Sequence, residues 1–150
     1  MVNIGKLQRM AHVCYKKKMK LFAKIISRYI RVVYACDISY MADVDSTVNF
    51  SHLGLGTVIG SYVKIGPRTK ILQNVSIGGR GEHRGPNGES MPTIGADVLI
   101  GAGACVLGPI VIGNNSTIGA NALVIHDVPE GAIVVGNPAR IIRGNKDGQD

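Results

Sequence analysis

Histidine is the side chain best suited to proton transfer near neutral pH, because its unperturbed pKa is about 6.5. The sequence contains four histidines, His12, His52, His83 and His126. His12 lies in a basic segment and is expected to be a surface side chain. His52 lies in a stretch where a repeating pattern changes phase, His83 lies in a polar loop, and His126 follows the last full repeat. Residue type alone does not single out one of the four as catalytic.

The same inventory argues against a metal site and a disulfide framework. The last three histidines are far apart in the sequence, and no His-x4-His pair of the kind that binds zinc is present. The three cysteines are Cys14, Cys36 and Cys105, and none belongs to a Cys-x-x-Cys motif. An odd and scattered set of cysteines predicts reduced thiols in a cytosolic protein.

A six-residue repeat must position these side chains. The repeated aliphatic positions, most of them followed by glycine, are Ile59, Ile65, Ile71, Ile77, Ile94, Ile100, Val106, Ile112, Ile118 and Val124. A period of six matches neither the helical period nor the strand period. It suits a triangular coil of three short strands, which buries its aliphatic residues by stacking on its neighbours. The sequence therefore predicts an all-β solenoid whose corners use glycine, because glycine escapes the steric penalty of a tight turn.

Two departures from the six-residue spacing predict irregular coils. The register that begins at Ile38 does not continue in phase to Ile59, and His52 lies inside the shifted coil. The second departure is the segment 79–93, which is polar and rich in glycine and proline. Because a solenoid does not need such a loop for stability, we expect an extruded loop at a functional site.

The repeat resembles that of the hexapeptide-repeat acyltransferases over about residues 37–144. The resemblance implies a left-handed parallel β-helix that works as a homotrimer. The left hand comes from the resemblance alone, because ordinary parallel crossovers are right-handed. We therefore expect a basic amphipathic helical segment at 1–36 and a β-helix at 37–144, including the loop 79–93 and a CoA-packing C-terminal segment at 129–144. A frayed tail is expected at 145–150.

Three segments are similar to the serine acetyltransferase branch of that family. They are residues 37–79, 100–104 and 136–140. Ser51-His52 falls where those enzymes carry an Asp-His pair. The resemblance implies direct transfer of an acetyl group from acetyl-CoA to a hydroxyl, with His52 as general base and without a metal. A backbone N–H near Gly78 or Gly79 would stabilise the developing oxyanion.

The resemblance also implies that CoA binds in a groove between neighbouring subunits. Two backbone amides on successive coils would hold the pantetheine arm, and Ala102 and Ala120 match them. Their spacing of eighteen residues is three hexads, which places one above the other. Arginines near the C-terminus would pair with the CoA phosphates. The remaining candidate CoA-binding residues are His126, Pro138, Arg140 and Arg143.

The sequence departs from the branch at the residue before the candidate base. Ser51 replaces the aspartate that orients the histidine, so the carboxylate that would stabilise an imidazolium is missing. Asp43, Asp45 or a backbone carbonyl group would then have to orient His52. A non-catalytic trimeric scaffold is the alternative that this substitution raises.

A second departure concerns the acceptor. Met91 replaces a loop histidine of the branch, in a candidate substrate loop that also contains His83 and Arg84. The helical N-terminal domain of those enzymes is reduced to about 36 residues. Both features favour a saccharide hydroxyl, as in capsule or exopolysaccharide assembly, and L-serine is the alternative acceptor.

The N-terminal segment carries the excess charge. Residues 1–36 contain nine Lys or Arg and no Asp or Glu, whereas the remainder contains eight basic and ten acidic residues. Apolar positions from Phe22 to Val33 follow helical spacing, with basic residues on another face. We interpret this helix as a cap over the unpaired strand edge of the solenoid. The alternative is contact of residues 16–33 with an anionic membrane surface.

Composition also bears on partners and location. The repeats carry no basic face that would match the N-terminal segment, so we do not expect a nucleic-acid partner. We find no signal peptide and no apolar stretch of membrane-spanning length. We therefore expect a cytoplasmic protein, peripheral at the inner face of the membrane if the basic helix contacts lipid.

Overall fold

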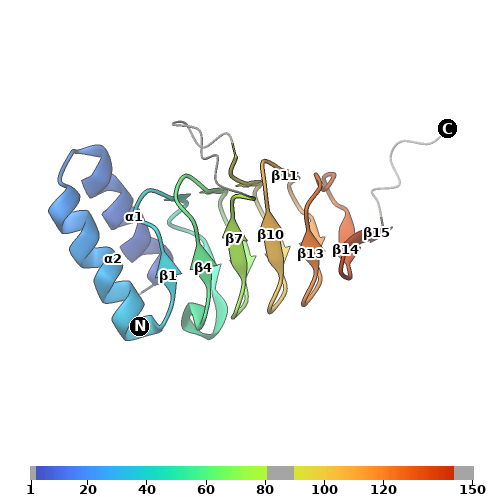
Figure 1. Cartoon of the computed structure of the whole chain (residues 1–150), viewed down its shortest axis with the longest axis horizontal. Coiled ribbons are helices and arrows are strands. Elements are labelled where there is room, and N and C mark those ends of the chain that lie inside the picture. The colour runs from blue at the N-terminus through green and yellow to red at the C-terminus, as the bar shows by residue number, and fades with distance from the viewer. Residues whose placement is uncertain (1–2, 81–89, 144–150) are drawn as a thin grey trace.

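The computed structural model describes residues 3–80 and 90–143, in which a helical hairpin precedes a solenoid of short strands (Figure 1). The helices are α1 (Ile4–Lys16) and α2 (Lys20–Tyr34), and a 3-10 turn, η1, spans Ser51–Gly54. The strands are β1 (Asp37–Ile38), β2 (Asp43–Val44), β3 (Asn49–Phe50), β4 (Val58–Ile59), β5 (Lys64–Ile65), β6 (Lys70–Ile71), β7 (Ser76–Gly78), β8 (Thr93–Ile94), β9 (Leu99–Ile100), β10 (Cys105–Leu107), β11 (Val111–Ile112), β12 (Thr117–Ile118), β13 (Leu123–Val124), β14 (Ile133–Val135) and β15 (Arg140–Arg143).

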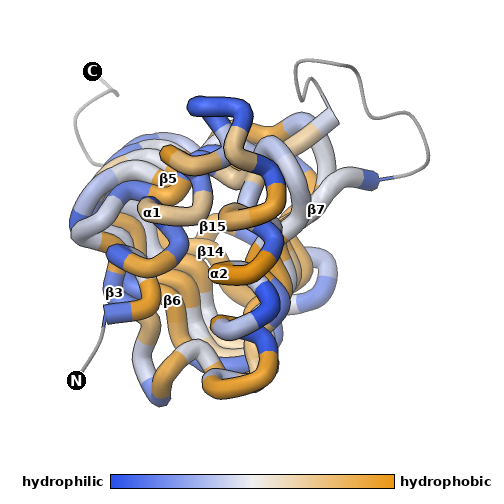
Figure 2. The backbone as a smooth tube through the Cα atoms, turned by 90° about the vertical axis from the view of Figure 1, so that its left-hand side faces the viewer, coloured by the Kyte–Doolittle hydropathy of each residue, from blue (hydrophilic) through white to orange (hydrophobic). Residues whose placement is uncertain are grey.

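The strands form three sheets that are the faces of a prism, and Figure 2 looks along its axis. Sheet A has the order β1-β4-β7-β10-β13, sheet B the order β2-β5-β8-β11, and sheet C the order β3-β6-β9-β12-β14-β15. All pairs are parallel except β14 with β15, which is antiparallel. In regular coils each residue pairs with the one eighteen positions later, as Leu99 does with Thr117. The predicted solenoid is therefore confirmed as a parallel β-helix.

The repeated aliphatic residues fill the interior of this prism. All ten positions identified in the sequence are at most 3% exposed. Neighbouring coils align them in columns, as the pairing of Ile59 with Ile77 and of Ile77 with Val106 shows in sheet A. Burying one such side chain stabilises a fold by about 1.5–3 kcal/mol. Stacking of coils is therefore the main source of stability, as the repeat predicts.

The glycines behind these residues serve the contact between coils rather than the turn itself. A Cβ on Gly66 would lie 2.7 Å from the carbonyl carbon of Gly95 in the next coil. The left-handed residue of that corner comes two positions later, at Arg68, with φ of 56°. Equivalent corners have Asn74, Asp97, Asn115 and Asn121 there. The expectation that glycine supplies the turn is wrong for these corners, because the backbones of stacked coils approach too closely for a Cβ.

The helical hairpin covers the N-terminal end of the prism, where β1, β2 and β3 are the edge strands (Figure 1). Gln8 Nε2 donates to the carbonyl oxygens of Ser39 at 2.6 Å and Ala42 at 3.2 Å. Ser27 Oγ donates to the carbonyl oxygen of Ile38 at 2.8 Å. The bonds to Ala42 and Ile38 satisfy carbonyl groups that the edge coil would otherwise leave unpaired, whereas the Ser39 carbonyl oxygen also accepts from the Ala42 N–H at 3.0 Å. The interpretation of the helical segment as a cap is confirmed.

His12 belongs to this cap and is buried, which corrects the expectation of a surface side chain. Its Nδ1 lies 3.3 Å from the carbonyl oxygen of Tyr40, and its Nε2 lies 3.8 Å from Asp43 Oδ1. The basic residues around it in the sequence occupy the outer face of α1, whereas His12 lies on the face that packs against the first coil. We therefore exclude His12 from the candidate site.

The predicted loop 79–93 is described only at its two ends, because residues 81–89 lie outside the described part of the chain. Thr93 is already the first residue of β8, so the solenoid resumes before the predicted end of the loop. The predicted tail 145–150 also lies outside the described residues.

Candidate functional site

His52 lies in the corner after β3, where the sequence register shifts. Phe50 and Ile59 are nine positions apart rather than six, so this corner has three additional residues. His52, Leu53 and Gly54 have φ of 52°, 55° and 64°, which makes three successive left-handed residues. Each left-handed non-glycine residue costs about 1–2 kcal/mol. Such a run of unfavourable conformations is more typical of functional sites than of structural turns.

Packing and hydrogen bonds hold this corner in place. Gly54 is buried, and a Cβ on it would lie 3.5 Å from Cys36 Sγ. The Asn74 N–H of the next coil donates to the carbonyl oxygen of Leu55 at 2.8 Å. Burial, with a smaller effect of the Asp37 carboxylate, raises the pKa of the Cys36 thiol to about 11. Cys36 therefore stays protonated and supports the corner as an apolar group.

The His52 side chain is exposed, and no hydrogen bond or ion pair joins it to another side chain within residues 3–80 and 90–143. The two aspartates suggested as substitutes have other partners. Asp43 pairs with Arg9 at 2.5 Å. Asp45 accepts from the hydroxyl of Thr47 at 2.6 Å, a bond that lowers the pKa of its carboxyl. Neither aspartate orients His52, which corrects that suggestion.

Ala102 and Ala120 lie on the same corner of the prism as His52, between sheets C and A. We call this corner the His52 corner; it comprises residues 51–57, 72–75, 101–104, 119–122 and 136–139 in successive coils. The Asn121 N–H donates to the carbonyl oxygen of Ala102 at 2.8 Å, so the two alanines stack. Their own N–H groups donate to none of the described residues. The column thus presents two free donors, one coil apart.

Gln73 extends this column by one coil and was quoted from the sequence only as part of a motif. The N–H of Gly103, in the next coil toward the C-terminus, donates to the carbonyl oxygen of Gln73 at 3.0 Å. Its side-chain Oε1 is buried and accepts no hydrogen bond from the described residues. The sequence holds one signal for it, because the equivalent positions of the next two coils are the small residues Ala102 and Ala120.

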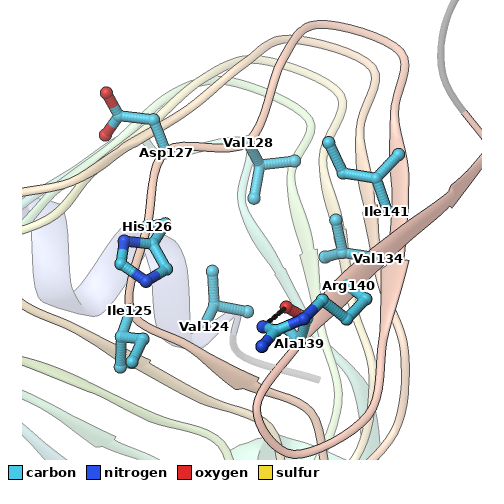
Figure 3. A pocket seen from close by; sticks show the side chains of 9 residues that line it. All are labelled: Val124, Ile125, His126, Asp127, Val128, Val134, Ala139, Arg140 and Ile141. Atoms are coloured by element: carbon cyan, nitrogen blue, oxygen red, sulfur yellow. Dashed lines mark hydrogen bonds between the residues drawn. The ribbon is translucent and has the colours of Figure 1, made fainter.

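The C-terminal candidates lie at the far end of the prism. Asn137–Pro138 is a cis peptide bond that precedes β15, and Arg140 and Arg143 are both exposed on that strand. A pocket of about 280 Å³ opens there beneath the last coil, between His126 on one side and Arg140 on the other (Figure 3). Its walls are mostly the aliphatic residues Val124, Ile125, Val128, Val134 and Ile141. Arg140 Nη1 donates to the Ala139 carbonyl oxygen at 2.9 Å.

Gly78 and Gly79 lie on a different corner, between sheets A and B, which we call the Gly78 corner; its described residues are 39–42, 60–63, 78–80, 90–92, 108–110 and 125–127. Gly78 ends β7, and its carbonyl oxygen accepts from the Gly108 N–H at 3.0 Å. A Cβ on Gly78 would meet no atom within 4 Å among the described residues. The Gly79 N–H donates to none of them. This corner therefore offers open space and a free donor.

The candidate substrate loop divides into a buried and an undescribed part. Met91 is 5% exposed, and a Cβ on Gly79 would lie 2.9 Å from its Sδ. Met91 therefore fills space beside the Gly78 corner instead of pointing outward from a loop. His83 and Arg84 lie outside the described residues.

The structure thus splits the candidate residues between two corners of one prism. His52, Ala102 and Ala120 occupy the His52 corner, and Gly78, Gly79 and His126 the Gly78 corner. Sheet A separates them by about six residues of extended chain, roughly 15–20 Å at about 3.3 Å per residue. The two groups do not meet within one subunit. Across the part of the chain that the structure describes, no cluster of three His, Cys, Asp or Glu could hold a metal ion.

Comparison with known proteins adds the following matches. The family model "Bacterial transferase hexapeptide (six repeats)" matches residues 91–126. A serine acetyltransferase of Helicobacter pylori is 37% identical over 134 residues, which are 89% of this chain and 76% of that protein. The serine acetyltransferase of Bacillus subtilis is 39% identical over 91% of this chain, which spans only 61% of that relative. A solved serine acetyltransferase in complex with CoA superimposes with a TM-score of 0.81 at 34% identity, covering 91% of this chain and 54% of that one.

Proposed function

The chain belongs to the serine acetyltransferase family of hexapeptide-repeat transferases, and from this membership we propose that it transfers an acetyl group from acetyl-CoA to the hydroxyl of L-serine. The observation that carries the proposal is the His52 corner, where an exposed histidine and two free N–H donors share one column. The solved relatives of the family imply a left-handed winding of the β-helix, which we adopt here.

The saccharide acceptor expected from the sequence is wrong. Curated relatives that are 37–41% identical over about nine-tenths of the chain are named serine acetyltransferases. The saccharide interpretation treated Met91 as a substrate-facing loop residue. Because Met91 is buried against Gly79, its identity reflects packing and carries no information about the acceptor.

In the proposed reaction His52 acts as general base. It takes the proton of the serine hydroxyl while the hydroxyl oxygen attacks the thioester carbon of acetyl-CoA. The negative charge moves to the thioester oxygen, where the free Gly79 N–H is the candidate oxyanion donor. Collapse of the tetrahedral intermediate breaks the carbon–sulfur bond, and the proton on His52 passes to the CoA sulfur. The products are O-acetylserine and CoA.

The free N–H groups of Ala102 and Ala120 would hold the pantetheine arm of acetyl-CoA along the His52 corner. The arm offers amide carbonyl oxygens as acceptors, and two donors one coil apart would fix both its position and its direction. At the far end of the prism, exposed Arg140 and Arg143 would pair with phosphates. His126 and Pro138 lie at the same end and would pack against the remainder of the nucleotide.

We further propose that the active enzyme is a homotrimer in which the His52 corner of one subunit faces the Gly78 corner of its neighbour. The separation of the two corners within one prism supports this arrangement, since one subunit alone cannot bring His52 to Gly79. A cyclic arrangement repeats the same contact around a closed ring. His83 and Arg84 lie outside the described residues, and their role as substrate-binding residues is part of this proposal.

A cytoplasmic location completes the proposal. Cys14, Cys36 and Cys105 are all unpaired in the structure. Unpaired thiols persist in reducing compartments, where acetyl-CoA is also produced.

The proposal is tested by incubating the purified full chain with acetyl-CoA and L-serine, while following thioester absorbance and product mass. L-Alanine, which lacks the hydroxyl, is the acceptor control. We expect serine-dependent turnover that falls about 10²–10⁴-fold in a His52→Gln variant with unchanged CoA binding. Turnover that persists in His52→Gln would contradict the assigned base. CoA binding without any turnover on L-serine would contradict the function and favour a non-catalytic scaffold.

A further inference from the structure

The outer face of the helical hairpin is apolar and has no partner within the described part of the chain. Large hydrophobic side chains at nine positions of this hairpin are exposed. They are Met10, Val13, Met19, Leu21, Phe22, Ile25, Tyr29, Val32 and Val33. Exposure reaches 68% at Leu21 and 73% at Val32, values that a side chain packed within its own subunit would not have. Contiguous exposed apolar surface of this kind marks an interaction site.

Helical spacing divides the surface of α2 into three stripes. Ala23 and Ile30 are fully buried and face the first coil. At about 100° per residue, Leu21, Ile25 and Val32 lie on the opposite side of the helix. Along the helical tube nearest the viewer in Figure 2, hydrophobic and hydrophilic segments alternate. The hydrophilic segments correspond to the basic stripe Lys20, Lys24, Arg28 and Arg31, which borders the apolar stripe.

The charge of the hairpin has one sign and is largely unneutralised. Residues 1–36 contain nine Lys or Arg and no acidic residue. Of these nine basic residues, only Arg9, with Asp43, and Arg31, with Asp37, form ion pairs within residues 3–80 and 90–143. The other seven basic residues form none and are exposed: Lys6, Lys16, Lys17, Lys18, Lys20, Lys24 and Arg28. Four of them, Lys16 to Lys18 and Lys20, gather where α1 turns into α2.

We propose that this face binds the surface of a membrane that contains anionic lipids. The apolar stripe would enter the region between headgroups and acyl chains, and the basic stripe would pair with the headgroup phosphates. Long lysine and arginine side chains can extend to the headgroups while the helix lies flat. None of the described helices is long and apolar enough to cross a membrane, so the contact is a peripheral one.

Charge complementarity favours this occupant over the hairpin of a second copy of the chain. Two hairpins that met through their outer faces would bring together two surfaces with seven unpaired basic residues each and no acid. Like charges held within a few ångströms oppose such a contact. An anionic surface supplies the opposite charge and an apolar layer beneath it. The proposal does not depend on the acetyl transfer reaction.

The test is sedimentation of the purified full chain with two kinds of vesicle, one of phosphatidylcholine alone and one with an added third of phosphatidylglycerol. We expect binding to the anionic vesicles, loss of that binding in high salt, and little binding to the neutral ones. A Leu21→Ser/Val32→Ser variant should bind at least about tenfold more weakly. A Lys24→Gln/Arg28→Gln variant should bind about thirtyfold more weakly, since each basic residue contributes about fivefold.

Matched control variants change exposed residues outside the hairpin. Val111 on β11 is 54% exposed, and Lys70 on β6 is also exposed. Val111→Ser and Lys70→Gln should leave vesicle binding unchanged, and circular dichroism establishes that all variants are folded. The proposal is overturned if the wild-type chain ignores anionic vesicles, or if Leu21→Ser/Val32→Ser binds them as well as wild type. It is equally overturned if the hairpin variants instead abolish self-association in light scattering or binding to a nucleic acid, with no vesicle binding in wild type.

Discussion

At the residue scale, the candidate base His52 follows a serine, where the resemblance to serine acetyltransferases implies an aspartate. Ser51 precedes His52 in a corner whose next two residues are also left-handed. An imidazole that accepts a proton develops positive charge, and an adjacent carboxylate would stabilise it more than a hydroxyl can. In the proposed reaction, Ser51 would therefore stabilise the imidazolium of His52 less than an aspartate would, and the described residues supply no carboxylate in its place.

A Ser51→Asp variant should accordingly be a better enzyme. We expect kcat/KM for L-serine to rise about tenfold, which corresponds to about 1.4 kcal/mol of transition-state stabilisation. Steady-state kinetics with acetyl-CoA in excess would measure the change. Ser51→Asn has a similar size without the charge and should show no such gain. An equal gain in both variants would mean that shape rather than charge matters at this position.

Individual residues differed in how well the sequence predicted them. The displaced register at Ile59 located the irregular corner around His52, because a hexad repeat makes any inserted residue visible. His12 and Met91 were misplaced for one shared reason. Each lies in a segment whose overall composition is polar or basic, while its own side chain faces the core. Composition reports on a segment, whereas burial is decided one side chain at a time.

At the element scale, the coil repeat depends on glycines that no turn rule requires. Gly66 does not have a positive φ, yet a Cβ there would meet the Gly95 backbone at 2.7 Å. Gly78 follows an inward aliphatic residue in the same way, but a Cβ there meets no described atom within 4 Å. The two glycines thus look alike in sequence and differ in their surroundings.

We expect Gly66→Ala to destabilise the fold by about 1–3 kcal/mol, because backbone atoms of the next coil must shift. Gly78→Ala should remain within about 0.5 kcal/mol of wild type, because its added methyl has free space. Urea unfolding of both variants, followed by circular dichroism, would measure the difference. Equal midpoints would refute the cross-coil explanation of these glycines.

The elements themselves were largely predictable from the repeat, because one aliphatic residue per face fixes both strand position and register. The reversal of chain direction between β14 and β15 could not be predicted from the repeat. Arg140–Arg143 has two aliphatic residues between two arginines and no hexad signal, and it pairs antiparallel with β14. An antiparallel pairing of this kind depends on the preceding turn, and six-residue periodicity carries no information about it.

At the scale of the whole molecule, the two-corner division of the candidate site means that the proposed reaction requires an assembly of subunits. If the proposed trimer is correct, His52 of one subunit and the Gly78 corner of its neighbour form each site. A His52→Ala chain and a Gly78→Trp chain would then be inactive for different reasons. A Cβ at position 78 meets no described atom within 4 Å, so we expect the Trp side chain to occupy the Gly78 corner rather than the core.

Mixing these two variants should restore activity. After joint unfolding and refolding in equal amounts, about one interface in four would combine an intact His52 with an intact Gly78 corner. We therefore expect about a quarter of wild-type activity from two inactive proteins, and a molar mass three times the 15.9 kDa of one chain. Recovery of no activity from mixed trimers would place both corners of a site in the same subunit.

The stacked coils of the prism also fix distances along its axis. Corners on successive coils are separated by the spacing of neighbouring strands, about 4.8 Å, and four such steps lead from the corner of His52 to that of Pro138. His52 and Pro138 are thereby held about 19 Å apart along the axis, a length fixed by the number of coils and independent of any loop. Removing one coil of eighteen residues would leave the two flanking coils to stack on each other and would shorten this distance by about 4.8 Å. The molecule would still fold, but a cosubstrate of unchanged length would reach past its end.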